Sequence, residues 1–352
     1  MSRQGLMVYG ASGYTAKLIA ELAHERGMKL VLAGRRLSSF AADASRLGFE
    51  ARELALDDPA ALRQGLDGIS VVLNCAGPFI DTFAPMVRAC LQVGAHYLDI
   101  TGELEVFEAA SRRDAQALTA GVVVLPGVGF DVVPSDCLAA HLKQRLPDAT
   151  KLTLAFTSTG RPSRGTATTM VRNLGDSGWV RRGGRLVPVP LGKLTREIDF
   201  GEGGCHHTVA IPWGDVSTAF HSTQIPDIEV YTRAPKAAAL AMRAGSRAKR
   251  LLGSPWVQSQ LLARVARGPA GPSDDQRARG KSWLYGEVVN AAGERRVSRL
   301  TAPEGYTLTA DAALKVAERV LRGEASPGFQ TPSRAFGADF VLELEGVRRE
   351  DE

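Results

Sequence analysis

The sequence predicts an α/β protein in which a Rossmann-type, doubly wound parallel sheet precedes a second α+β domain with a mainly antiparallel sheet. The first observation behind this prediction is an apolar run that leads into the glycine turn Gly10-Ala11-Ser12-Gly13. The second is the alternation of strand-like and helical stretches over roughly the first 130 residues, which is typical of a parallel sheet covered on both faces. The third is the mixture of short strands with Gly- and Pro-containing loops in the second half.

The first strand and its turn predict a site for a dinucleotide. Gly10 permits a tight turn, Gly13 lets the backbone approach a pyrophosphate, and Ala16 lets the first helix pack closely on the strand. The N-terminus of that helix then faces the anion. An ordinary strand-to-helix corner is the alternative reading of such a turn. We expect the cofactor to be held here by Gly10, Ala11, Ser12, Gly13, Tyr14 and Thr15.

Arg35 and Arg36 favour NADP(H) over NAD(H). They follow a second apolar strand, Leu30 to Ala33, about 20 residues past the turn, where this fold contacts the adenosine ribose. An acid at that point would hydrogen-bond the ribose hydroxyls of NAD, whereas a guanidinium pairs with the 2′-phosphate of NADP. The alternative is a solvated pair of charges that opens a surface helix.

The remaining strands of the first domain are expected near Leu54, Val72, Leu98 and Val123, with helices near Leu18 and Ala41. In an open parallel sheet the ligand lies beyond the carboxyl ends of the strands, so the residues that follow each strand are candidates for the site. On this basis we also assign the following residues to the cofactor: Asn74, Ala76, Gly77, Pro78, Phe79, Thr101 and Gly102.

Length and composition indicate a globular protein with two lobes. The 352 residues are 44% hydrophobic and 23% charged, enough to bury two cores. Neither a basic start followed by an apolar stretch nor an apolar run long enough to cross a membrane is present, so we expect a cytoplasmic protein without a transmembrane segment. The four cysteines form no Cys-x-x-Cys pair and are expected to be reduced, buried thiols.

The net charge of +5 is too small to indicate nucleic-acid binding. The basic excess is local, because residues 231–299 contain fourteen Lys or Arg against four Asp or Glu. This segment is either a surface for an acidic partner or an ordinary solvated helical face.

Candidate catalytic residues are Asp131, Asp136 and Arg164. The two acids follow the sixth strand, where a substrate would meet the nicotinamide, so either can serve as the acid or orient a substrate amine. Capping of a helix that starts near Ser135 is the alternative. Arg164 lies in a polar turn before an amphipathic helix and suits a carboxylate or a phosphate.

We expect no metal. Cys205-His206-His207 is the one cluster that suggests it, but adjacent histidines on a strand point to opposite faces, and no third ligand accompanies them at a zinc spacing.

Four motifs stand out by their order and spacing: Gly10 to Thr15, Asn74 to Phe79, His96 to Glu103 and Gly129 to Asp136. Together they resemble the saccharopine dehydrogenase-like oxidoreductases, and in particular the branch that includes the trans-acting enoyl reductases. The resemblance implies an NADP(H)-binding domain over residues 1–134, a substrate and dimerisation domain over 135–310, and a C-terminal segment, 311–352, that returns toward the nucleotide lobe. It also implies a homo-oligomer.

Two reactions and one non-enzymatic function follow from these expectations. Hydride transfer to an activated C=C of an acyl chain, small or carrier-bound, is the first, and reduction of C=N or C=O in an amino or oxo acid is the second. A sensor or carrier-interacting protein that binds NADP(H) without turnover is the alternative. A short-chain reductase is disfavoured, because its Tyr-x-x-x-Lys pair does not occur in the chain.

Overall fold

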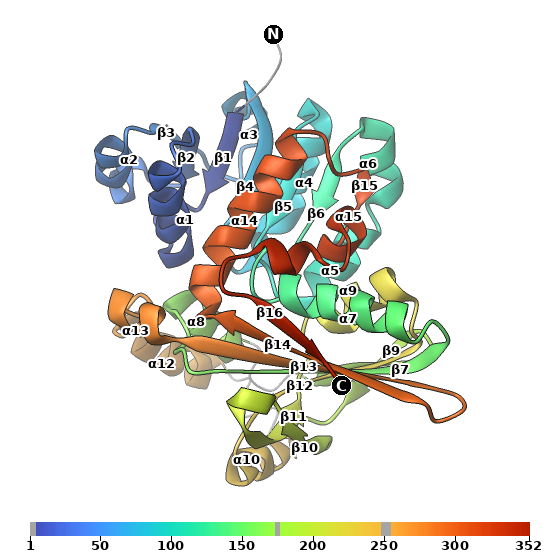
Figure 1. The fold of residues 1–352 in the computed structure, drawn as a ribbon. Coiled ribbons are helices and arrows are strands. Elements are labelled where there is room, and N and C mark those ends of the chain that lie inside the picture. Colours follow the sequence, from blue (N-terminus) through green and yellow to red (C-terminus); the bar gives the residue numbers. More distant parts are fainter. Residues whose placement is uncertain (1–4, 173–176, 248–254) are drawn as a thin grey trace. The chain divides into compact units, whose positions relative to one another are not determined.

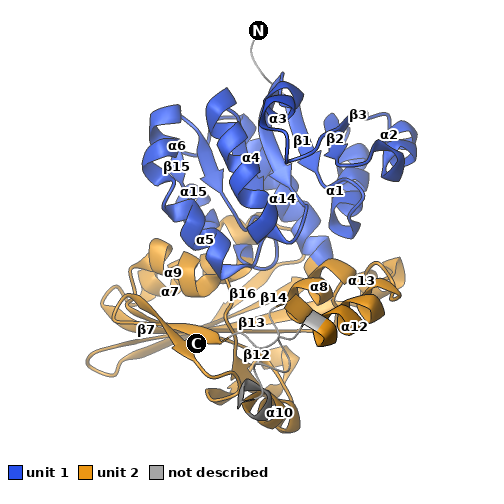
Figure 2. Ribbon diagram, turned by 180° about the vertical axis from the view of Figure 1, so that it is seen from behind, with its two compact units in different colours: residues 1–133, 306–337 blue, residues 134–305, 338–352 orange. Residues whose placement is uncertain are grey.

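The computed structural model describes residues 5–172, 177–247 and 255–352. The chain divides into two compact units (Figures 1 and 2). The first unit comprises residues 1–133 and 306–337, and the second unit comprises residues 134–305 and 338–352.

A seven-stranded sheet forms the centre of the first unit, in the order β15-β6-β5-β4-β1-β2-β3. Every neighbouring pair is parallel, which confirms the predicted doubly wound sheet. Its strands are β1 (Gly5–Tyr9), β2 (Leu30–Gly34), β3 (Glu50–Glu53), β4 (Ile69–Asn74), β5 (His96–Asp99), β6 (Val123–Leu125) and β15 (Gly328–Phe329).

Helices cover both faces of this sheet. Met7, Tyr9 and Val72 pack on one face against α3 (Pro59–Gly65), α4 (Phe79–Val93), α5 (Leu104–Ser111) and α6 (Asp114–Ala120). Figures 1 and 2 show α1 (Tyr14–Glu25) and α14 (Gly305–Leu321) on the opposite face from α4. Burial on both faces explains why strand residues are apolar without alternation. The remaining short elements are η1 (Leu37–Ser39), α2 (Ala41–Leu47) and α15 (Pro332–Phe336).

The second unit contains a nine-stranded sheet whose main path runs β10-β11-β12-β7-β13-β14-β16, with β8 paired to β12 and to β9. Only the β12–β7 pair is parallel, which confirms the mainly antiparallel prediction. The strands are β7 (Ala149–Ser158), β8 (Gly178–Arg182), β9 (Arg185–Val189), β10 (Thr195–Asp199), β11 (Cys205–Ala210), β12 (Asp227–Arg233), β13 (Lys281–Asn290), β14 (Arg295–Pro303) and β16 (Arg348–Asp351).

One face of this sheet packs against α7 (Val133–Arg145). A Cβ atom at Gly286 would lie 2.5 Å from Leu142 Cδ1, so α7 approaches the backbone of β13 more closely than a side chain would allow. The other helices of the second unit are α8 (Arg164–Arg172), α9 (Asp215–Thr223), α10 (Lys236–Arg247), α12 (Pro255–Ala266) and α13 (Asp274–Arg279), with the short turns η2 (Gly201–Gly203) and η3 (Phe340–Glu343).

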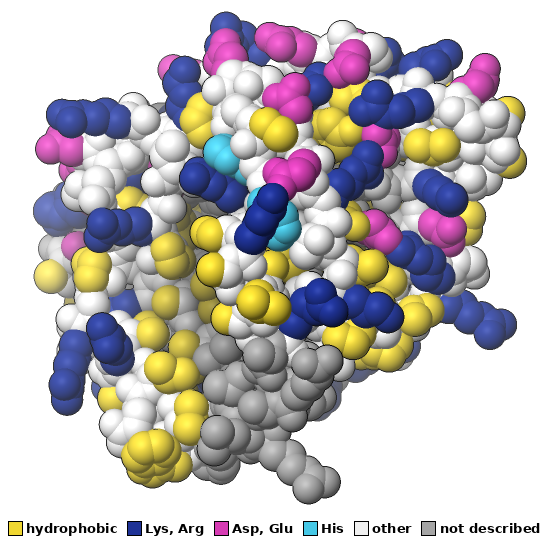
Figure 3. All heavy atoms as spheres, turned by 90° about the horizontal axis from the view of Figure 1, so that it is seen from below, with side chains coloured by type: hydrophobic (Ala, Val, Ile, Leu, Met, Phe, Trp, Pro, Cys, Tyr) yellow, Lys and Arg dark blue, Asp and Glu magenta, His cyan; other side chains and the backbone are white. Residues whose placement is uncertain are grey.

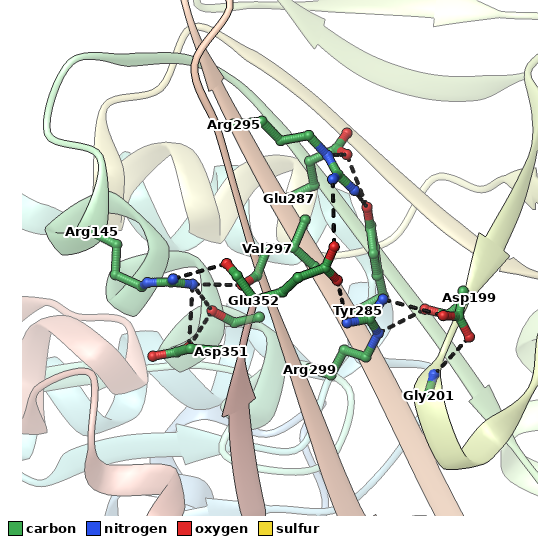
Figure 4. A network of polar contacts seen from close by, with 11 residues as sticks. Arg145, Asp199, Gly201, Tyr285, Glu287, Arg295, Val297, Arg299, Asp351 and Glu352 are labelled. Carbon is green, nitrogen blue, oxygen red and sulfur yellow. Dashed lines mark hydrogen bonds and ion pairs between the residues drawn. The ribbon is translucent and has the colours of Figure 1, made fainter.

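A polar network joins β10, β13, β14 and β16 on the other face (Figure 4). Buried Glu287 accepts hydrogen bonds from Arg295, from Arg196 Nη2 at 2.6 Å and from Tyr285 at 2.9 Å. Burial alone would raise the pKa of Glu287, but the hydrogen bonds from these two arginines lower it. Arg299 extends the network by donating to Glu352 Oε2 at 2.7 Å. Neighbouring strands are therefore joined by charged groups as well as by backbone hydrogen bonds.

Two local expectations require correction. The cysteines are free thiols, but only Cys90 and Cys137 are buried, whereas Cys205 is exposed at the start of β11. Of the expected C-terminal segment, residues up to 337 join the first unit, whereas residues 338–352 belong to the second unit. The reason is strand pairing, because β16 adds to the free edge of β14.

Candidate functional site

The turn after β1 lies so close to the loop after β4 that residue 10 has no room for a side chain. Gly10 has φ +87°, and a Cβ atom there would lie 2.8 Å from the backbone nitrogen of Ala76. Gly10 N and Ala11 N both donate to Ala33 O, at 2.8 and 3.0 Å, and Gly13 N donates back to Gly10 O at 2.9 Å. These bonds hold the turn against the end of β2 and close to the loop after β4.

Helix α1 begins directly after this turn, at Tyr14, with no side-chain cap and no acidic residue in its first turn. The N–H groups at a helix N-terminus attract anions, and an acid here would oppose that attraction. Ser12 is exposed beside the turn, and Tyr14 and Thr15 are half-buried. The ring of Tyr14 packs edge-on against Tyr306 of α14, with the ring centroids 5.2 Å apart. Such an uncapped N-terminus beside a tight glycine turn suits an anion.

Arg35 and Arg36 follow β2 and are both exposed. Neither guanidinium forms an ion pair with another described residue. The side chain of Glu53, at the end of β3, lies at the same turn, because its Oε2 accepts a hydrogen bond from Leu37 N at 2.8 Å. The sequence analysis missed Glu53, since it is separated from the arginines by a whole helix and is brought back by the pairing of β3 with β2.

Asn74 lies at the predicted place, but its side chain holds the loop rather than facing outward. It is fully buried, its Oδ1 accepts from Ala76 N at 3.0 Å, and its Nδ2 donates to Thr82 Oγ1 and Tyr97 Oη at 3.0 and 3.2 Å. Gly77 is exposed, the Gly77–Pro78 bond is cis, and Phe79 begins α4. Asn74 is therefore a residue that positions the loop 75–78.

Asp99 organises the next two loops. It is buried and accepts from Tyr97 Oη at 2.8 Å, Thr101 N at 3.0 Å and Gly127 N at 2.9 Å. Burial raises the pKa of Asp99 to about 7 in spite of these hydrogen bonds. Thr101 is also buried, and its hydroxyl accepts from Glu103 N at 3.0 Å. The loops after β5 and β6 are thus joined through one carboxyl group.

Glu103 connects the loop after β5 to the start of α4. Its two carboxylate oxygens accept from Phe79 N and Ile80 N, at 2.9 and 2.8 Å. Burial raises the pKa of Glu103. The sequence motif contained this residue, but nothing in its spacing indicated which helix it would cap.

Asp131 lies beside Gly102 at the same end of the sheet. A Cβ atom at Gly102 would be 2.9 Å from Asp131 Oδ2, so the glycine leaves room for the carboxyl group. Burial raises the pKa of Asp131 to about 7, and the negative charge of Glu103 adds to the effect. At neutral pH this carboxyl group therefore holds a proton for a substantial part of the time.

The other two candidate catalytic residues belong to the second unit. Asp136 lies in the first turn of α7, fully buried, and accepts from Ser222 of α9. Its neighbour Ser135 donates to Asp215 Oδ1 of α9 at 2.8 Å, so it links two helices. Arg164 begins α8, is exposed, and donates weakly to Ala266 O at 3.4 Å. Of the three candidate catalytic residues, Asp131 alone lies in the same unit as the residues predicted to bind the cofactor.

His206 and His207 bind backbone carbonyls of Gly203 and Ala234, both at 2.8 Å. No group of three or more His, Cys, Asp or Glu residues that could hold a metal ion occurs in the part of the chain that the structure describes.

Several cations of the basic segment are paired with acids. Arg277 contacts Asp274, Lys236 contacts Glu197, and Arg295 and Arg299 belong to the network of Figure 4. Lys249 and Arg250 lie outside the described residues. Figure 3 shows Lys and Arg side chains dispersed over one face among acidic and apolar ones, rather than gathered in a continuous patch. Within the described residues, no helix is long and apolar enough to span a bilayer.

The sheet order, the bare turn at Gly10 and the uncapped start of α1 define a dinucleotide-binding domain of the Rossmann type. Residues 6–125 match the family described as Saccharopine dehydrogenase NADP binding domain. Residues 6–125 are therefore similar to an NADP-binding domain of the saccharopine dehydrogenase type, which confirms the resemblance and agrees with the expected cofactor, NADP(H).

Curated relatives agree with this assignment over the same part of the chain. The trans-acting enoyl reductase of Mycobacterium leprae is 32% identical over 149 residues, which cover 40% of this chain and 36% of the relative. The human saccharopine dehydrogenase-like oxidoreductase is 30% identical over 161 residues, covering 40% and 38%. The matched stretch thus spans little more than a third of each relative's own length.

The fold likeness extends over both units. Apo saccharopine dehydrogenase (L-Glu forming) from Saccharomyces cerevisiae superimposes with a TM-score of 0.67, at 14% sequence identity, and the match covers 99% of this chain and 100% of that one. This likeness confirms the predicted fold class.

Proposed function

We propose that the chain is an NADP(H)-dependent oxidoreductase that reduces an activated C=C bond of an enoyl substrate, presented as a small thioester or on a carrier. The observation that carries the proposal is the bare turn at Gly10, directly before the uncapped start of α1. The similarity to relatives named trans-acting enoyl reductase supports the choice of substrate class.

The residues around this turn fit the cofactor. The backbone of residues 10–15 would hold the pyrophosphate, and Arg35 with Arg36 would hold the 2′-phosphate of the adenosine ribose. Gly77 is exposed in the loop after β4, and Gly102 makes room for the carboxyl group of Asp131 in the loop after β5. When bound, the nicotinamide would supply the hydride.

Asp131 supplies the proton in this proposal. Reduction of an enoyl group requires a proton at the carbon next to the carbonyl, in addition to the hydride that arrives at the β-carbon. A carboxyl group with a pKa of about 7 holds this proton at neutral pH and releases it readily. Asp136 is a weaker candidate, because its side chain is fully buried and bonded to Ser222.

The test combines binding with turnover. Calorimetric titration with NADPH and with NADH should show NADPH bound more tightly. NADPH consumption should then occur with enoyl thioesters, and not with oxo acids mixed with amines. Turnover of the oxo acid mixtures alone would replace the enoyl proposal by C=N or C=O reduction, and binding without any turnover would favour a sensor or carrier-interacting protein.

We also propose a homo-oligomer located in the cytoplasm, a proposal that rests on the sequence resemblance and on the composition of the chain. Equilibrium sedimentation of the purified chain tests the oligomeric state.

A further inference from the structure

A hollow of about 310 Å³ lies in the second unit, where β7 ends and β13 begins. The two strands are joined there by hydrogen bonds between Thr159 N and Lys281 O, at 3.1 Å, and between Lys281 N and Thr159 Oγ1, at 3.0 Å. The residues that line the hollow are Thr159, Gly160, Arg161, Asp275, Gln276, Arg279 and Gly280.

Two glycines of the lining pack closely against Glu304. A Cβ atom at Gly280 would lie 2.6 Å from Glu304 Cγ, and one at Gly160 would lie 3.0 Å from Glu304 Oε1. Glu304 itself is buried. The missing side chains at residues 160 and 280 therefore make room for Glu304, which packs against both segments of the lining.

Arg161 and Arg279 give the hollow its charge. Both are exposed, and neither guanidinium forms an ion pair or a hydrogen bond with another described residue. Asp275 is the single acid among the lining residues. Gln276 accepts from Ser273 N through its Oε1 atom, which leaves its amide nitrogen as a further donor on the same wall.

We propose that this hollow binds a phosphate group of the substrate's thioester carrier. Two guanidinium groups that line one hollow, without a partner among the described residues, match a phosphate, which accepts paired hydrogen bonds from arginine. The inference rests on the proposed reduction of an enoyl thioester, because such thioesters are carried on coenzyme A or on the phosphopantetheine arm of a carrier protein. Both carriers bear phosphate esters.

The binding test uses the chain saturated with NADP⁺, so that adenosine phosphates do not report on the nucleotide site. Coenzyme A, 4′-phosphopantetheine, adenosine 3′,5′-bisphosphate, inorganic phosphate and phosphate-free pantetheine are titrated by calorimetry. The double substitution Arg161→Ala with Arg279→Ala is compared with Arg185→Ala, which removes an exposed arginine of β9 outside the hollow.

Coenzyme A should bind the unaltered chain. The double substitution should lower the affinity for coenzyme A by about tenfold or more for each arginine removed. Arg185→Ala should leave its affinity unchanged, and pantetheine should bind weakly to all three proteins. Tighter binding of 4′-phosphopantetheine than of the bisphosphate would assign the hollow to the phosphate that both carriers share. The reverse order would assign it to the nucleotide end of coenzyme A, and binding of inorganic phosphate alone would overturn the carrier proposal.

Equal coenzyme A affinity in the double variant and the unaltered chain would also overturn the inference. The proposed function is tested separately with crotonyl-N-acetylcysteamine, a thioester without phosphate. NADPH oxidation with this compound, unaffected by the double substitution, would keep the enoyl reductase proposal even if the hollow binds no phosphate. If no thioester led to oxidation of NADPH, the proposed reaction would be refuted. The binding titrations would still test the phosphate site independently.

Discussion

Gly102 leaves the space that the carboxyl group of Asp131 occupies, since a Cβ atom at residue 102 would lie 2.9 Å from Asp131 Oδ2. The two residues come from the loops after β5 and β6, and Glu103, next to Gly102, caps α4 through its carboxylate. A carboxyl group of raised pKa is thus held among the loops that follow β4, β5 and β6.

Asp131→Asn should reduce NADPH consumption by about 100-fold or more, because the amide cannot supply a proton. In the unaltered chain, kcat should fall as the pH rises through about 7, where Asp131 loses its proton. The pH profile of kcat from 5.5 to 9 is the measurement. A profile of the same shape in Asp131→Asn would assign the proton to another group.

The raised pKa of Asp131 also predicts a change in stability. The folded state holds the proton more tightly than the unfolded chain, so the free energy of unfolding should fall as the pH rises from about 4 toward 7 and then level off. Asp99 contributes in the same direction. Urea unfolding at a series of pH values should therefore show a shallower decline in Asp131→Asn than in the unaltered chain. If the free energy of unfolding declined equally with pH in both proteins, the pKa of Asp131 would not be raised in the folded state.

Gly10→Ala should abolish NADPH binding and destabilise the chain. The new Cβ atom would clash with Ala76 N, in addition to the strain of a positive φ. Gly48→Ala is the matched control, because its φ is +71° and no atom lies within 4 Å of a Cβ there. The control should lose only about 1–2 kcal/mol of unfolding free energy and still bind NADPH. Similar losses of binding in both variants would contradict the role given to Gly10.

Substitution of both Arg35 and Arg36 by Ala should weaken NADPH binding by about 1–3 kcal/mol and leave NADH binding nearly unchanged. Calorimetric titration with each nucleotide measures the difference. Arg88→Ala, which removes an exposed arginine of α4, should affect neither. Equal weakening of NADPH and NADH would remove the assignment of the 2′-phosphate to these arginines.

Asp351→Asn should lower the free energy of unfolding by weakening the contacts of the C-terminal strand, β16. Burial would raise the pKa of Asp351, but hydrogen bonds from Ser298 and His141 and the charge of Arg145 lower it. A lowered pKa stabilises the fold above the unfolded value of about 4 and loses that effect as the pH falls below it. Because the side chain is 43% exposed, we expect a loss of no more than about 1 kcal/mol at pH 7. Unfolding at pH 7 and pH 3 should show the difference only at the higher pH.

The sequence predicted those parts of the site that depend on short segments. The turn from Gly10 to Gly13 and the order of the parallel strands follow from local chain geometry and from the alternation of strands and helices. The roles of Asn74 and Glu103 could not be predicted in the same way. Asn74 meets Tyr97 only because β4 and β5 pair in register, and Glu103 caps α4, whose start lies 24 residues earlier in the chain.

For Asp136, the sequence indicated a role but not the contact that its side chain makes. Its place after the sixth strand indicated a catalytic acid, but the structure pairs it with Ser222, 86 residues further along. The paired contact of Ser135 with Asp215 has the same origin. Such links between α7 and α9 depend on the packing of a whole second unit, and the sequence around residue 136 contains no sign of it.

The return of residues 306–337 to the first unit gives the chain an order of assembly. The ribosome finishes β1 to β6 early, but β15 and α14 emerge only after residues 134–305 have been made. Until then β6 is an edge strand, paired with β5 but with its other edge open, and the sheet lacks the helix that covers part of one face. A nascent chain of this length is therefore exposed to wrong pairing at β6, and a fragment cut at residue 134 would retain that exposed edge permanently.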